Sequence, residues 1–88
     1  MMSNNACAKA IMLYLNHALR KQEAVSFNDV MGAPQCKKYS VRDIGKTLEE
    51  LRRSGLVKAK SRFGCSELLE FTATEITEKG KEFISEFC

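Results

Sequence analysis

The sequence predicts a mainly α-helical fold with one small antiparallel β-hairpin, and three observations lead to this expectation. Apolar residues recur at helical spacing near the N-terminus and again in the middle of the chain. Ser-x-x-Asp segments at Ser26 and Ser40 have the form of capping boxes that open helices. Two predicted strands follow, one that alternates apolar and basic residues and one rich in β-forming residues, and a stretch that contains Gly64 separates them. Because 88 residues with 44% hydrophobic content suffice for one core but not for two, we expect a single domain over residues 1–88.

The first predicted helix runs from Asn5 to Lys21. Its core positions recur at helical spacing and are Ala8, Ile11, Leu15 and Ala18. Additional apolar residues, among them Leu13, widen the stripe beyond one face. We therefore expect this helix either to be surrounded by the domain or to present part of its surface to a partner.

A short strand at Ala24–Val25 and a short helix from Ser26 to about Met31 are predicted next. The Ser26 hydroxyl and the Asp29 carboxylate would accept hydrogen bonds from the unpaired amides at the start of this helix. The segment 32–34, Gly-Ala-Pro, ends it, because proline has no N–H to continue the hydrogen-bond ladder. A loop over residues 35–39 leads to the next helix.

The most regular predicted helix spans residues 40–54. It opens with the second capping box, Ser40 to Asp43, and ends before Gly55. Arg52 and Arg53 fall in its last turn, where cations suit the negative end of the helix dipole. The side chains expected in the core are Val41, Ile44, Leu48 and Leu51.

The remaining residues predict the hairpin and a C-terminal helix. Residues 56–60 alternate apolar and basic side chains, residues 68–74 are rich in β-formers, and residues 61–67 would form the turn. Thr77 is the expected N-cap of the last helix, whose apolar stripe is Phe83, Ile84 and Phe87. The first and last helices are candidate surfaces for a homodimer. The alternative is that they pack on each other within one monomer.

Charge is divided along the chain more strongly than the net charge of +3 suggests. Residues 37–62 hold nine basic and three acidic residues, whereas residues 67–86 hold six acidic and two basic ones. A localised basic surface is typical of a protein that binds a polyanion, although a solvated basic face gives the same count.

Two motifs resemble the winged helix-turn-helix family of transcriptional regulators, including its MarR and PadR types. Leu48–Val57 (LEELRRSGLV) looks like the end of a recognition helix entering the wing, and Ile76–Gly80 (ITEKG) looks like the exit from the second wing strand. The resemblance implies a sequence-specific transcriptional regulator that binds double-stranded DNA. Residues 40–54 would lie in the major groove, and the wing, residues 58–67, would lie on the adjacent backbone or minor groove.

The candidate DNA contacts that follow from this resemblance come from three segments. In the expected recognition helix, Arg42, Lys46 and Thr47 would face outward, and Arg42 and Lys46 would be neighbours because they are four residues apart. Residues before the helix would bind phosphate, and the wing would add cations, with Arg62 nearest its tip. The full set is Lys37, Lys38, Tyr39, Ser40, Arg42, Lys46, Thr47, Lys58, Lys60 and Arg62.

Other functions have weaker support in the residues. No nucleophile or acid–base pair lies in a recognisable catalytic motif, so we expect neither enzymatic activity nor a cofactor. No apolar stretch is long enough for a membrane span, and we expect a cytoplasmic protein. The four cysteines lack the close spacing of a typical zinc site, and free thiols are expected at Cys7, Cys36, Cys65 and Cys88.

Two alternatives to a DNA-binding regulator stay open. One is a protein-interaction module that uses the winged-helix fold without binding DNA, because fold alone does not determine function. The other is a redox or metal sensor built on the regulator, in which a thiol such as Cys65 responds to oxidation.

Overall fold

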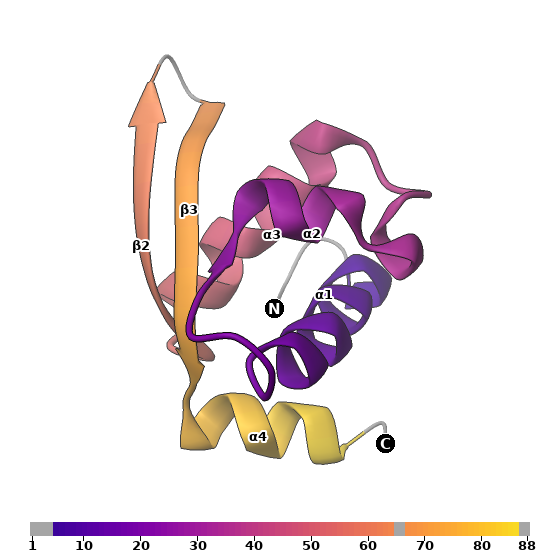
Figure 1. The fold of residues 1–88 in the computed structure, drawn as a ribbon, viewed down its shortest axis with the longest axis vertical. Coiled ribbons are helices and arrows are strands. Elements are labelled where there is room, and N and C mark those ends of the chain that lie inside the picture. The colour runs from indigo at the N-terminus through magenta and orange to yellow at the C-terminus, as the bar shows by residue number, and fades with distance from the viewer. Residues whose placement is uncertain (1–4, 65–66, 87–88) are drawn as a thin grey trace.

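Helices pack on one side of a three-stranded antiparallel sheet in the computed structural model of the chain, which describes residues 5–64 and 67–86 (Figure 1). The elements of this part of the chain are α1 (Asn5–Ala18), β1 (Val25–Ser26), α2 (Phe27–Gly32), a 3-10 turn (Pro34–Cys36), α3 (Val41–Arg53), β2 (Val57–Gly64), β3 (Glu67–Ile76) and α4 (Glu78–Ser85). The mixture of helices and a small sheet agrees with the predicted class, and the sheet has one strand more than the hairpin alone.

The sheet has the strand order β1-β3-β2, so the hairpin forms two of its strands and β1 extends it at the other edge of β3. Val25 lies opposite Ala73, and Val57 lies opposite Ile76. Both hairpin strands are longer than predicted. Residues 61–64, expected in the turn, belong to β2 and pair with residues of β3 between Glu67 and Phe71. Irregularities between Lys58 and Ala59 and between Arg62 and Phe63 shift the register of this ladder.

Side-chain caps begin α2 and α3 at the residues that the sequence predicted. The Ser26 hydroxyl accepts a hydrogen bond from the Asp29 amide at 3.2 Å, and the Asp29 carboxylate accepts one from the Ser26 amide at 3.0 Å. At α3, the Ser40 hydroxyl accepts from the Asp43 amide at 3.1 Å. Gly55, with a φ of +75°, ends α3 in the left-handed conformation that glycine adopts without steric cost.

The core lies between the helices and the inner face of the sheet. From α1 it receives Cys7, Ile11, Met12 and Leu15, from α3 it receives Ile44, Leu48 and Leu51, and from β3 it receives Phe71 and Ala73. Val41 was expected in this core but is 60% exposed. It is the first residue of α3 and precedes Ile44, the first residue of the helix that is buried.

The start of α4 is locked against the turn between α3 and β2. The Thr77 hydroxyl donates to the Gly55 carbonyl, and the Thr77 amide donates to the Leu56 carbonyl at 3.1 Å. The Gly80 amide in turn donates to the Thr77 hydroxyl at 3.1 Å. A Cβ atom at Gly80 would lie 2.1 Å from the Leu56 carbonyl oxygen, so the helix approaches this turn as closely as only glycine permits.

Candidate nucleic-acid interface

The N-terminal half of α3 presents two cations to solvent. Its opposite face is fixed in the core by Ile44, Leu48 and Leu51. Arg42 and Lys46 are both exposed, and because they are four residues apart they lie on one face of the helix. Among the described residues, no carboxylate forms an ion pair with either side chain.

The segment before α3 adds two more exposed cations and two residues with structural roles. Lys37 and Lys38 are exposed, and the Lys38 ammonium lies 5.4 Å from the centre of the Tyr39 ring. Tyr39 is half-buried and packs against the core. The Ser40 hydroxyl is already engaged by the Asp43 amide as the helix cap. Lys37 and Lys38 are therefore the side chains of this segment that remain available to a phosphate.

The expectation that Thr47 faces outward is wrong, because its side chain is only 1% exposed. Ile44, Thr47, Leu48 and Leu51 follow the i, i+3, i+4, i+7 spacing of one helix face, so Thr47 belongs to the buried stripe. Its hydroxyl donates to the Asp43 carbonyl at 2.7 Å, which satisfies a polar group that has no access to solvent. Thr47 therefore has no surface on which to contact DNA.

The hairpin cations lie on a different face from those of α3. Ser61 points toward α3, since its hydroxyl donates to the Glu49 carboxylate at 3.1 Å. Side chains alternate along a strand, so Lys60 and Arg62 point to the opposite, outer face of the sheet, where all three basic residues of β2 are exposed. The cations of α3 and of β2 therefore do not form the one localised basic surface that the distribution of charge along the chain indicates.

Two of the three hairpin cations also have acidic partners across the ladder. Lys58 pairs with Glu75 at 3.4 Å, and Arg62 pairs with Glu70 at 3.3 Å. Lys60 lies opposite Thr72 and forms no ion pair with a described residue. The positive charge expected on the wing is thus largely neutralised. The residue range expected for the wing, 58–67, includes residues 65–66, which lie outside the described residues.

The C-terminal end of α3 holds a buried carboxylate that sequence reasoning missed. Glu49 accepts hydrogen bonds from Arg52, Arg53 and Ser61. Burial by itself would raise the pKa of Glu49, but the hydrogen bonds from these three donors outweigh it and hold the pKa below its ordinary value. The spacing of Glu49 from Arg52 and Arg53 signals the ion pairs, whereas the contact with Ser61 depends on the tertiary fold.

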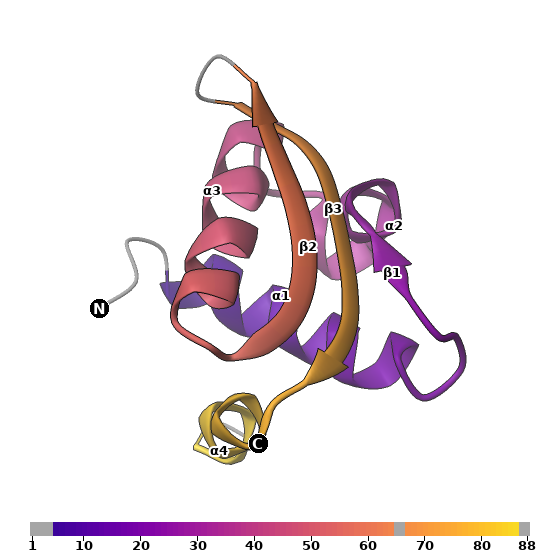
Figure 2. The same ribbon diagram turned by 90° about the vertical axis from the view of Figure 1, so that its left-hand side faces the viewer.

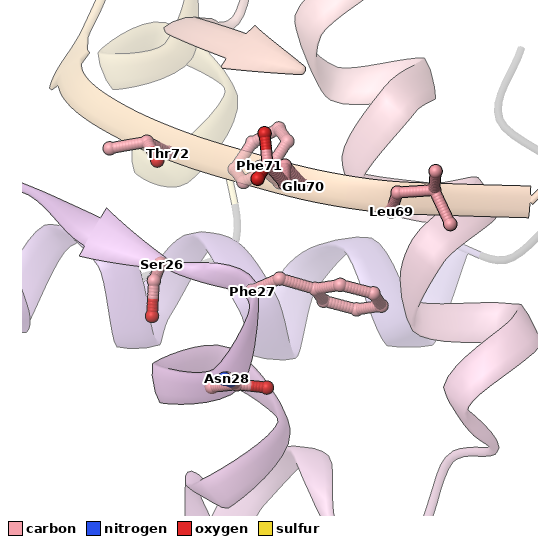
Figure 3. A pocket seen from close by; sticks show the side chains of 7 residues that line it. All are labelled: Ser26, Phe27, Asn28, Leu69, Glu70, Phe71 and Thr72. Carbon is pink, nitrogen blue, oxygen red and sulfur yellow. The ribbon is translucent and has the colours of Figure 1, made fainter. Parts of the chain in front are cut away.

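A shallow groove of about 340 Å³ lies where β1 ends beside β3 (Figure 3). Ser26 is the last residue of β1 and pairs with Thr72, so within the described residues β3 has no strand partner on this side from Glu67 to Phe71. The ring of Phe27 extends along β3 in the direction of Leu69, which is 52% exposed (Figure 3). The groove therefore offers an open strand edge next to apolar side chains.

The two cysteines that the structure describes, Cys7 and Cys36, are both buried. Burial raises the pKa of the Cys7 thiol, and it raises the pKa of the Cys36 thiol to about 11. Because the thiolate is the reactive species, neither side chain has the properties of a redox sensor. Cys65 and Cys88, the other candidates for such a role, lie outside the described residues.

Residues 5–64 and 67–86 contain no group of three or more side chains that could together hold a metal ion. None of the helices within these ranges has the length and apolar character that crossing a membrane requires. No family model, curated protein or solved structure matches the chain.

Proposed function

We propose that the protein is a winged helix-turn-helix regulator that binds double-stranded DNA with the N-terminal half of α3 and the segment before it. The contacts come from Lys37, Lys38, Arg42 and Lys46. The observation on which the proposal depends is that these four cations are exposed and have no acidic partner among the described residues. Arg42 and Lys46 enter the major groove, and Lys37 and Lys38 neutralise phosphates.

The order and arrangement of the elements support a winged helix for this proposal. A helix, a short strand, two helices, a hairpin and a final helix follow one another, and β1 pairs with the hairpin through β3. Figure 2 displays α3 beside β2, with the N-terminal end of the helix toward the end of the hairpin that Gly64 and Glu67 close. In this arrangement a duplex that contacts Arg42 also passes close to that end of the hairpin.

The experiment is a selection from random duplexes, followed by affinity measurements on the selected sequence with two variants of equal charge. Arg42→Ala/Lys46→Ala removes both cations from the exposed face of α3. Arg20→Ala/Lys21→Ala removes the same charge just after α1, where Arg20 lies beside the first residues of α4. We expect affinity to fall by more than about 100-fold in the first variant, since each base contact contributes about 1–3 kcal/mol. Equal losses in both variants would contradict the proposal.

We also propose a homodimer through α1 and α4, although these helices expose fewer apolar side chains than the sequence indicated. Most apolar side chains of α1 lie in the core, and among the large ones that the structure describes Leu13 is exposed, at 40%. In α4, Ile84 is buried and Phe83 packs against the core, while Phe87 lies outside the described residues. Sedimentation that finds only 9.9 kDa particles at micromolar concentration would exclude the dimer.

A second function, a protein-interaction module without DNA binding, is favoured by the open edge of β3. An extended segment of a partner could add as a strand beside residues 67–71, with an apolar side chain between Phe27 and Leu69. The neutralised cations of β2 agree with this alternative. The variant Leu69→Lys distinguishes the two functions. It blocks the edge groove, so binding of a partner strand should be lost, and it leaves the exposed face of α3 unchanged, so duplex binding should be kept.

A further inference from the structure

Glu49 is the one carboxylate that is buried among the described residues, with 6% of its surface exposed. Its oxygens accept a hydrogen bond from Arg52 Nε at 3.1 Å, a second, charge-assisted one from the Arg52 guanidinium, and one from Arg53 Nε at 3.1 Å. A further hydrogen bond comes from the Ser61 hydroxyl on β2. Both guanidinium groups at the end of α3 are thus held by a single anion.

The position of Glu49 on α3 gives these ion pairs a consequence for the proposed DNA site. Arg42, Lys46, Glu49 and Arg53 follow one another at intervals of four, three and four residues, so they fall on one stripe of the helix. Without Glu49 this stripe would be cationic along the whole length of α3. The Arg53 side chain is 73% exposed, so a phosphate would have access to it if the ion pair were broken.

We propose that Glu49 increases the selectivity of the protein for its target duplex over other sequences by keeping Arg52 and Arg53 from the phosphate backbone. This inference rests on the proposed DNA function. Arginine contacts to phosphate strengthen binding to every sequence alike, because phosphates carry no base information. By holding both guanidiniums, Glu49 confines binding to the N-terminal half of α3, where Arg42 and Lys46 reach base edges. Glu49 acts through the two arginines and does not itself contact DNA.

The test is the salt dependence of duplex binding by Glu49→Gln, measured on the selected duplex and on a scrambled one. Each additional phosphate contact steepens the slope of log affinity against log salt by about 0.9. We expect a slope steeper than that of the wild type by about 0.9 to 1.8, and a smaller affinity ratio between the two duplexes. An unchanged slope in a folded variant would overturn the proposal, whereas an absence of duplex binding by the wild type would overturn the proposed function as well.

Two further variants separate this effect from net charge and from damage to the fold. Glu75→Gln removes the same charge from the outer face of the hairpin, where Glu75 pairs with Lys58, and should leave the slope unchanged. Arg53→Ala in the wild-type background should also leave it unchanged, because that guanidinium is already held. If Glu75→Gln steepens the slope as much as Glu49→Gln, or if Arg53→Ala reduces it by about 0.9, the proposal is wrong.

Discussion

At the scale of single residues, α3 shows that position on the helix, and not residue type, decides whether a side chain faces the core or the solvent. Thr47 is polar, yet it lies on the stripe of Ile44, Leu48 and Leu51 and is buried. Val41 is apolar, yet it is exposed because it precedes the part of the helix that packs. Helical periodicity predicted most of this face. The prediction for Thr47 is wrong because it gave the polar residue type more weight than the position of Thr47 on the stripe.

Glu49 provides a prediction about pH. Its pKa in the folded protein is held below the unfolded value, so its ion pairs stabilise the fold above the unfolded pKa. This contribution is lost as pH falls through the folded pKa, when the carboxylate takes up a proton. Urea unfolding of wild type and Glu49→Gln should differ by about 1–3 kcal/mol at neutral pH. The difference should shrink as pH falls below the ordinary glutamate pKa of 4.5, and a difference that stays constant on acidification would show that the carboxylate charge is not responsible.

At the scale of elements, the beginnings of the helices were predictable because local chemistry fixes them. Ser26 with Asp29, Ser40 and Thr77 cap their helices through hydrogen bonds that span three residues. The length of the hairpin was not predictable in the same way. Residues 61–64 extend β2 by pairing with residues 67–71 of β3, and the Ser61 hydroxyl also contacts Glu49 of α3, so the length of the strand depends on contacts across the hairpin and with the helix.

The junction between α4 and the α3–β2 turn gives a prediction about stability. Gly80→Ala would place a methyl group against the Leu56 carbonyl oxygen, and because backbone cannot move aside cheaply, we expect a loss of at least about 2 kcal/mol in unfolding free energy. Gly32→Ala is the matched control. A Cβ atom there would meet nothing within 4 Å, so this variant should gain about 0.4–1 kcal/mol. Thermal denaturation of the two variants measures both, and equal melting temperatures would show that α4 does not dock closely.

At the scale of the whole molecule, the division of charge along the sequence does not translate directly into a division of charge in space. The acidic residues of β3 lie beside the basic residues of β2 and neutralise two of them. Position along the chain could not reveal this, because cross-strand neighbours are set by register. Four of the cations without acidic partners among the described residues, Lys37, Lys38, Arg42 and Lys46, lie before α3 and in its first turns, whereas Arg20, Lys21, Lys60 and Lys79 lie elsewhere.

The most direct test of this account follows the backbone amides by NMR while the selected duplex is added to the 9.9 kDa protein. We expect the largest chemical-shift changes between residues 37 and 47, with small changes along β1 and at the groove residues Leu69 to Thr72. Changes concentrated at that groove, or an absence of changes at saturating duplex, would contradict DNA recognition by α3.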